Sequence, residues 1–166
     1  MNNLELIQAK ILNRKKLENQ LAVWRFKDKK IVFTNGCFDL LHLGHIDYLS
    51  KAKDQGDVLI VGVNTDASVQ RLKGENRPVT DEISRSTIMA SLQFVSAVVL
   101  FDEDTPYDLI QQVQPDVLVK GSDYKPEDIV GYDVVKAKGG EIVTIDFLEG
   151  YSTTGIFNKI AGIIRI

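Results

Sequence analysis

The sequence contains a single cysteine, Cys37, so no disulfide can form within the 166-residue chain and no cysteine-based metal cluster can assemble. Such scarcity of cysteine is typical of proteins from a reducing compartment, and we expect a cytoplasmic protein. The apolar runs, such as residues 58–61, are far shorter than the roughly 20 residues that cross a bilayer. The first 22 residues mix apolar and charged side chains and lack the continuous apolar core of a secretory signal.

An excess of charge of one sign is also missing. The chain has 20 Lys and Arg residues against 23 Asp and Glu residues, a net charge of -3, so the charge indicates no general attraction to nucleic acid or to an anionic membrane. With 44% hydrophobic and 26% charged residues the composition is that of an ordinary globular domain. An anionic ligand must therefore be bound by a few local groups.

Two common phosphate-binding signatures are absent as well. The sequence contains no G-x-x-x-x-G-K-[ST] segment, and no G-x-G-x-x-G segment follows the first apolar strand. These absences disfavour a P-loop kinase and an ordinary dinucleotide-dependent dehydrogenase.

Short apolar segments rich in β-branched residues alternate with segments of helical spacing along the chain. This alternation predicts the α/β class, as a doubly wound Rossmann-like sandwich with a five-stranded parallel sheet and helices on both faces. We expect strands at 31–34, 57–63, 96–101, 116–119 and 141–145, and helices at 43–55, 65–72, after a capping Thr80, after a capping Thr105, at 126–138 and at 153–163.

The N-terminal part of the chain predicts a separate amphipathic helix. Apolar residues recur at near-helical spacing over 3–22, so we expect a leading helix within residues 1–27 and a single α/β domain over 28–166. This helix has more apolar positions than a five-stranded sandwich needs, which favours a homodimer.

Ligands of doubly wound domains bind beyond the carboxyl ends of the strands, near the point where strand order reverses. Both histidines of the chain, His42 and His45, follow the first predicted strand. Because they are three residues apart at a helix start, they can point together at an anion bound by free backbone N–H groups. Gly44 between them leaves room for a phosphate to approach the backbone.

Two other interpretations of the histidines are open. His42 can cap the turn while His45 packs against the sheet, or both can join Asp39 in a zinc site. The sequence has no third and fourth zinc ligands at a known spacing. The position beyond the first strand, together with Gly44, favours a ligand-binding pair.

The segment His42-Leu43-Gly44-His45 resembles the H-x-G-H signature of the cytidylyltransferase-like nucleotidyltransferase superfamily. A second superfamily element, a Ser-Thr-Thr segment that opens the last helix, is matched by Ser152, Thr153 and Thr154. Residues 34–39, 71–74, 77–78, 103–106 and 119–124 are similar to the adenylyltransferase domain of ADP-heptose synthases. Members of that family join ATP to D-glycero-β-D-manno-heptose 1-phosphate, releasing pyrophosphate and giving ADP-heptose for lipopolysaccharide or S-layer glycan assembly.

The resemblance implies a role for each matched residue. His42 and His45 would stabilise charge on the leaving pyrophosphate, with Lys73 and Arg85 as further catalytic cations. The implied cofactor is Mg²⁺, held mainly by the nucleotide phosphates, and the implied partner is a separate sugar kinase that supplies the acceptor. ATP would be bound by Thr34, Asn35, Gly36, Phe38, Asp39, Gly44, Lys120, Gly121, Asp123, Ser152, Thr153 and Thr154, and the sugar phosphate by Lys53, Asp66 and Lys73.

Simpler interpretations compete with these roles. Lys73 can be a solvated loop residue, Arg85 a surface partner of Asp81, Lys53 a surface charge, Lys120 a strand-end lysine, and Asp66 and Asp123 turn formers. At the level of function, the alternatives are a glycerol 3-phosphate cytidylyltransferase, an enzyme that adenylates flavin or pantetheine phosphates, and a nucleotide-binding regulatory module without turnover. Neither spacing nor charge identifies adenine or a seven-carbon sugar.

Overall fold

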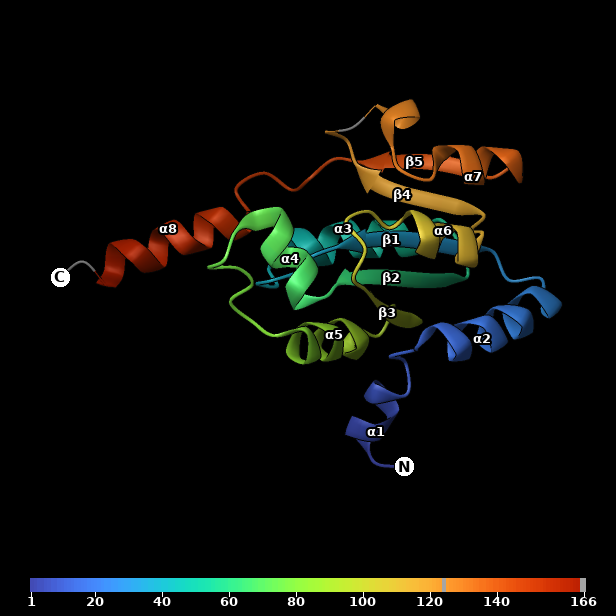
Figure 1. The fold of residues 1–166 in the computed structure, drawn as a ribbon, viewed down its shortest axis with the longest axis horizontal. Coiled ribbons are helices and arrows are strands. Elements are labelled where there is room, and N and C mark those ends of the chain that lie inside the picture. Colours follow the sequence, from blue (N-terminus) through green and yellow to red (C-terminus); the bar gives the residue numbers. More distant parts are fainter. Residues whose placement is uncertain (124, 165–166) are drawn as a thin grey trace.

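The computed structural model describes residues 1–123 and 125–164, and its centre is one parallel sheet of five strands (Figure 1). The spatial order is β3-β2-β1-β4-β5, so strand order reverses between β1 and β4. This arrangement confirms the predicted five-stranded parallel sheet. The strands are β1 (Ile31–Gly36), β2 (Val58–Asn64), β3 (Ala97–Phe101), β4 (Val117–Gly121) and β5 (Glu141–Ile145).

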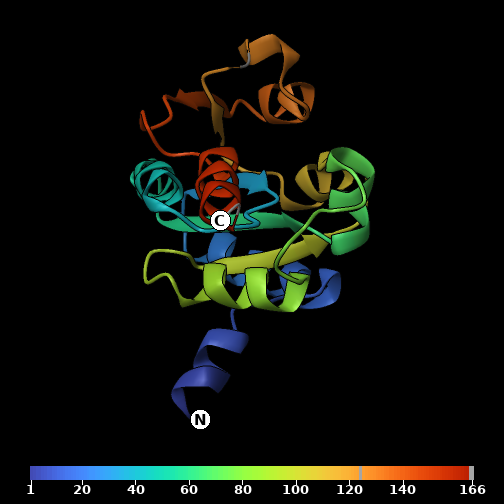
Figure 2. The same ribbon diagram turned by 90° about the vertical axis from the view of Figure 1, so that its left-hand side faces the viewer.

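Helices cover both faces of the sheet, as Figure 2 shows. Side chains that alternate along the strands supply two separate apolar clusters: Phe33 and Ile60 belong to one, and Val32 and Leu59 to the other. The doubly wound prediction is therefore confirmed. The first cluster includes residues of α2 (Arg14–Phe26), α6 (Tyr107–Val113) and α7 (Tyr132–Ala137), and the second includes residues of α3 (Leu43–Lys53) and α5 (Glu82–Ser91).

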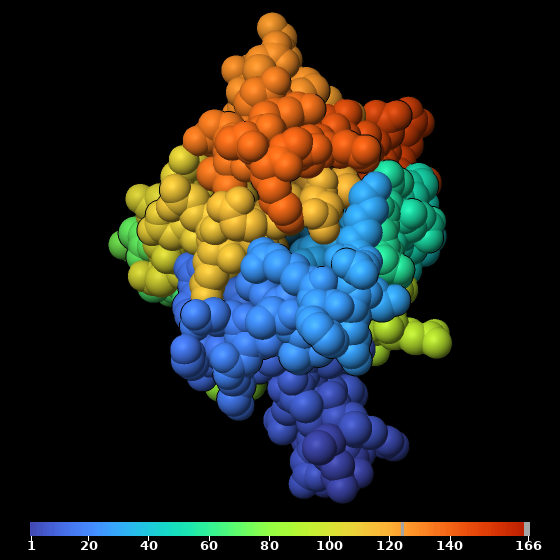
Figure 3. All heavy atoms as spheres, turned by 90° about the vertical axis from the view of Figure 1, so that its right-hand side faces the viewer, coloured from blue at the N-terminus to red at the C-terminus, as the bar shows by residue number. Residues whose placement is uncertain are grey.

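The prediction of one leading helix is wrong, because the N-terminal segment folds as α1 (Asn3–Gln8) and α2. Between them Ile11 pairs with Val98 at the edge of β3, and this pairing interrupts the helix. The Asn13 side chain then accepts a hydrogen bond from the Lys16 N–H (2.9 Å) and starts α2. Figure 3 shows α1 projecting from the body of the molecule.

Two predicted caps are also corrected. Helix α5 is capped by Asp81, whose carboxylate accepts from the Ser84 N–H (2.7 Å), because the Thr80 hydroxyl is bonded to Asp39 instead. Helix α6 begins after Pro106, and no side chain caps it. The helix expected after β2 is α4 (Asp66–Lys73).

The predicted helix over 126–138 is two shorter elements, the 3₁₀ turn η1 (Pro126–Asp128) and α7. Gly131 separates them because its backbone is left-handed (φ 88°). The final helix, α8 (Thr153–Ile164), agrees with its prediction and extends from the end of the sheet to which the strands point (Figure 1). None of the helices in the described part of the chain has the length and apolar character needed to cross a membrane.

Candidate functional site

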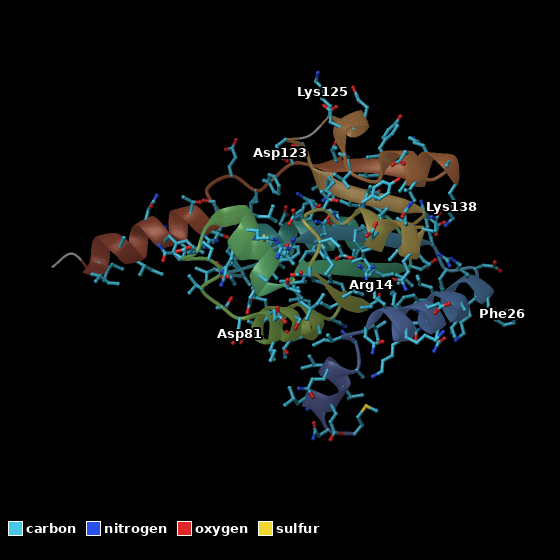
Figure 4. All side chains as sticks on the ribbon, viewed as in Figure 1. Arg14, Phe26, Asp81, Asp123, Lys125 and Lys138 are labelled. Carbon is cyan, nitrogen blue, oxygen red and sulfur yellow. The ribbon has the colours of Figure 1, made fainter. Side chains whose placement is uncertain are left out.

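The carboxyl ends of β1 and β4 open into a cavity of about 360 Å³, which we call the central cavity. It lies where strand order reverses, because α3 after β1 and α7 after β4 pack on opposite faces and leave a crevice between the strand ends. Asp123 lies at this end of the sheet and Lys138 at the opposite end (Figure 4). Of the predicted residues, the central cavity is lined by Asn35, Gly36, Phe38, Asp39, His45, Lys73, Lys120, Gly121, Asp123 and Thr153.

A second cavity of about 470 Å³, the histidine cavity, adjoins the first at the starts of α3 and α8. The two cavities share His45, Lys73 and Thr153 among their lining residues. The fold thus brings together two motifs from distant parts of the sequence. The remaining predicted residues in the histidine cavity are His42, Gly44, Ser152 and Thr154.

The two histidine rings are stacked, with centroids 3.8 Å apart and planes inclined by 22°. Burial, then the nearby charges of His42 and Lys73, lower the pKa of His45 to about 4, and burial also lowers the pKa of His42. Both imidazoles are therefore neutral at pH 7. Within the described residues the Nδ1 atoms of both rings are buried without a hydrogen-bond partner.

Gly44 permits a close approach between the two motifs. A Cβ atom at this position would lie 3.0 Å from His42 Nδ1 and 3.1 Å from Tyr151 Cβ. Gly44 lines the histidine cavity, and the direction in which a side chain would point from it is occupied by His42 and Tyr151. Glycine at this position lets the segment before α8 pack against the His42 ring.

Asp39 lines the central cavity, but its carboxylate is fully engaged by the loop over residues 74–80. It accepts hydrogen bonds from Arg77 Nε (2.7 Å), the Val79 N–H (2.8 Å) and the Thr80 N–H (3.0 Å). Burial would raise the pKa of Asp39, but these donors outweigh it and hold that pKa below its usual range. Asp39 therefore positions the loop rather than offering a free carboxylate to a nucleotide.

The structure corrects the prediction that Arg85 is a catalytic cation. Its side chain is completely buried and donates to the Cys37 carbonyl (2.6 Å), the Thr80 carbonyl (3.0 Å) and the Asp66 carboxylate (2.7 Å). Because Asp81 caps α5, it is not the partner of Arg85 either. Asp66, expected to bind substrate, instead neutralises this buried guanidinium.

Two further residues that were predicted to belong to the site lie outside both cavities. Lys53 is at the C-terminal end of α3, where Nζ donates to the Gly56 carbonyl (3.0 Å). An 11-residue helix separates its ends by about 15 Å, so Lys53 is remote from the histidines at the other end. Thr34 is completely buried, and its hydroxyl is paired with the Tyr48 hydroxyl (2.8 Å).

Lys120 supplies a partly buried positive charge at the floor of the central cavity. It extends from β4 and donates to Asn35 Oδ1 on the neighbouring β1. Burial lowers the pKa of Lys120 to about 8, and the nearby charge of Asp123 opposes this shift. The ammonium group is thus held between the two strands at which the order reverses.

Sequence reasoning missed five residues that line the central cavity: Cys37, Tyr48, Asn64, Arg77 and Phe147. Arg77 could have been found, because it belongs to the same polar loop as Lys73 and to a segment already matched to a family. Tyr48 could not, because its spacing is that of a core residue of α3, and Phe147 lies in the loop after β5 outside any motif. Gly121 allows Phe147 to reach the site, since a Cβ atom at Gly121 would lie 2.2 Å from the Phe147 ring.

The chain is similar to known nucleotidyltransferase-type sequences. A family model described as cytidylyltransferase-like matches residues 33–157. The bifunctional protein HldE of Geobacter metallireducens is 55% identical over 152 residues, which cover 92% of this chain and 31% of that protein. HldE of Nitratiruptor sp. is 59% identical over 133 residues, which cover 80% of this chain and 28% of that protein. The chain thus spans about a third of the length of these curated relatives.

Two solved structures share the fold. A lipopolysaccharide core biosynthesis protein from Thermoplasma volcanium superposes with a TM-score of 0.61 and 32% identity, covering 73% of this chain and 99% of that one. A pantoate-beta-alanine ligase from Francisella tularensis superposes with a TM-score of 0.60 and 21% identity, covering 94% of this chain and 79% of that one. The second similarity is informative about the fold alone.

Replacing Arg85 distinguishes its structural role from a ligand-binding one. We expect Arg85→Leu to lower the free energy of unfolding by about 3 kcal/mol, because two buried carbonyl groups and a carboxylate lose their donor. Urea unfolding measures this change. The exposed Arg71→Leu, which removes surface ion pairs to Asp102 and Asp104, should change the free energy of unfolding much less. Unchanged stability with weakened ATP binding would instead establish Arg85 as a phosphate ligand.

Proposed function

The chain belongs to the cytidylyltransferase-like family, and from this premise we propose that it transfers the adenylyl group of ATP to a sugar phosphate, with release of pyrophosphate. The acceptor we propose is D-glycero-β-D-manno-heptose 1-phosphate, which gives ADP-heptose. One observation carries the proposal: the stacked pair of His42 and His45 and the start of α8 border one histidine cavity, which adjoins the crevice at the strand ends.

The reaction needs no general base from the protein. A phosphate monoester, with a second pKa of about 6, is already an anionic nucleophile at neutral pH. One of its oxygens forms a bond to the α-phosphorus of ATP, the bond from that phosphorus to the bridging oxygen breaks, and the electron pair leaves on pyrophosphate. The protein must therefore align the two phosphates and stabilise their charge.

The residues present suit this task. The two histidines and the N-terminus of α8, with Ser152, Thr153 and Thr154, would hold the leaving pyrophosphate in the histidine cavity. Lys73 and Arg77, which line both cavities, would neutralise the phosphates between them.

The rest of the nucleotide belongs in the central cavity. Backbone N–H groups near Gly36 and Phe38 would hold the α-phosphate, in a loop that Phe38 turns with a left-handed backbone (φ 48°). The nucleoside would lie against Gly121, Asp123 and Phe147, all of which line this cavity.

Mg²⁺ is part of the proposal as a cofactor that arrives with the nucleotide. In residues 1–123 and 125–164 no group of three His, Cys, Asp or Glu side chains could hold a metal ion, whereas Lys73, Arg77 and Lys120 supply positive charge to the cavity. These cationic side chains would bind phosphate oxygens and not the metal. The ion itself would be held by phosphate oxygens and water, the coordination that Mg²⁺ prefers. When bound, the ion would neutralise charge on the phosphates.

Several observations support ATP and a heptose phosphate over the alternatives. The chain resembles ADP-heptose synthases in five segments, is over 50% identical to HldE proteins, and is 32% identical to a protein described as acting in lipopolysaccharide core biosynthesis. The acceptor must already carry a phosphate, so a sugar kinase must act before this step; we propose a separate one. A cytosolic location, where ATP is available, completes the proposal.

A matrix of substrates tests the function. The purified protein is incubated with Mg²⁺, with ATP or CTP, and with heptose 1-phosphate, glycerol 3-phosphate or FMN, and pyrophosphate release is measured. We expect product with ATP and heptose 1-phosphate. A preference for CTP with glycerol 3-phosphate would overturn the substrates but not the reaction class, and nucleotide binding without pyrophosphate in any well would favour a regulatory module.

The histidines should act on turnover more than on affinity. We expect His42→Ala and His45→Ala each to lower the single-turnover rate by about 10²- to 10³-fold, because each removes a hydrogen-bonding group that stabilises charge on the leaving group. The dissociation constant of ATP should change far less. Lys53→Ala, on the same helix but outside the site, serves as the control and should leave the rate unchanged. Near-normal rates in both histidine variants would contradict the assignment.

We also propose a homodimer. In the leading segment Leu17 and Leu21 are buried in the core of the chain itself, whereas Leu4, Leu6 and Phe26 are exposed. Apolar surface is exposed on α8 as well, where Ile160, Ile163 and Ile164 are 45%, 67% and 73% exposed. Sedimentation should give twice the monomer mass of 18.6 kDa, and Ile163→Asp should shift it toward the monomer. A monomer at micromolar concentration would refute the dimer.

A further inference from the structure

A third cavity, the side cavity, lies beyond Lys120 and Asn35 when viewed from the central cavity. Its volume is about 240 Å³. It is enclosed by the end of α4, the loop that precedes α6, and η1, which come together beside the reversal of strand order. Nothing in the proposed binding of ATP occupies this space.

The central cavity adjoins both other cavities. It shares His45, Lys73, Arg77, Phe147 and Thr153 with the histidine cavity, and Asn35 and Lys120 with the side cavity. Among the described residues, the histidine cavity and the side cavity have no lining residue in common. The central cavity, in which the α-phosphate is proposed to lie, therefore connects two cavities that are separate from each other.

This arrangement matches the geometry of phosphoryl and nucleotidyl transfer. The attacking and leaving oxygens lie roughly in line on opposite sides of the phosphorus. If pyrophosphate leaves into the histidine cavity, the nucleophile must approach from the other side of the α-phosphorus. The side cavity is suited to this approach because it adjoins the central cavity and shares no lining residue with the histidine cavity. The acceptor phosphate would then lie next to the Lys120 ammonium, which is partly buried between the two cavities and bonded to Asn35.

The walls of the side cavity suit a polyhydroxylated molecule. Asp104, Thr105 and Asp128 line it and present two carboxylates and a hydroxyl, while its apolar lining includes the buried residues Pro106 and Ile129. Arg71 Nε donates to Asp104 (2.9 Å) and orients that carboxylate. Carboxylates accept hydrogen bonds from hydroxyl groups, so these walls favour a sugar ring. Because carboxylates also repel phosphate, the phosphate of the acceptor would be directed away from them, toward Lys120.

We propose that the side cavity binds the sugar ring of the acceptor and that Asp104 and Asp128 determine its specificity by accepting hydrogen bonds from sugar hydroxyls. This inference rests on the proposed function for the direction of the attack. In the step that follows, the acceptor phosphate oxygen bonds to the α-phosphorus as the bond to pyrophosphate breaks. No proton has to be removed, because the attacking oxygen is already deprotonated.

Equilibrium binding tests the side cavity without requiring turnover. Binding of heptose 1-phosphate is measured by calorimetry in the presence of Mg²⁺ and an α,β-methylene analogue of ATP, which cannot react. We expect Asp104→Asn and Asp128→Asn each to weaken this binding by about tenfold, since each removes a hydrogen bond to a charged acceptor. Binding of the ATP analogue alone should stay within about twofold of the wild type, since no nucleotide contact is lost.

The chain offers matched controls. Glu103→Gln removes an ion pair to Arg14 from the residue next to Asp104, and Glu127→Gln removes the charge next to Asp128; neither residue lines the side cavity. Both controls should bind heptose 1-phosphate as the wild type does. Thermal unfolding of all variants checks that the fold is intact.

A smaller acceptor adds a second comparison. Glycerol 3-phosphate has only two free hydroxyl groups and no sugar ring to place them against the two carboxylates, so Asp104→Asn and Asp128→Asn should weaken its binding less than that of heptose 1-phosphate. The proposal is overturned if the wild type does not bind heptose 1-phosphate, if both acceptors lose affinity equally, or if the variants weaken binding of the ATP analogue instead. Specific binding of the sugar without pyrophosphate release from ATP would refute the proposed function and leave the side cavity as a sugar-binding site.

Discussion

The pairing of β1 with β4 is the constraint on which the whole site depends. Parallel strands require crossover connections, and the chain leaves these two strands toward opposite faces of the sheet, so no helix can cover the edge between their carboxyl ends. The central cavity opens at that edge. Asn35 and Lys120, each one residue before the end of its strand, meet across it. The side cavity borders this pair, and the histidine cavity adjoins the central cavity.

Two buried charged residues hold the loops around that opening. Asp39 accepts hydrogen bonds from the loop over residues 74–80. Arg85 connects the carbonyl groups of Cys37 and Thr80 with the Asp66 carboxylate. Burying a charge is costly unless its hydrogen-bonding groups are satisfied, and here each charge has several partners. The result is a preorganised frame, so the cations in the loop need not reorganise when a phosphate arrives.

The electrostatics of the site differ from those of the chain as a whole. The net charge of -3 gives no general attraction for anions, yet Lys73, Arg77 and Lys120 gather at one cavity. Burial lowers the pKa of His45 and of Lys120, so both groups hold their protons less tightly than in water.

The sequence by itself determined the parallel sheet, because a strand buried on both faces needs an uninterrupted apolar run. It also determined the position of the histidine pair and the start of α8, because each of these motifs is a local pattern. Only the tertiary structure decided which charged residues line the cavities. Arg85 turns inward because Asp66 and the Cys37 carbonyl, far away in sequence, meet it there, and Lys53 lies outside the site because the length of α3 carries it away. The leading helix breaks at Ile11 for the same reason: the edge of β3 offers hydrogen bonds that no local pattern reveals.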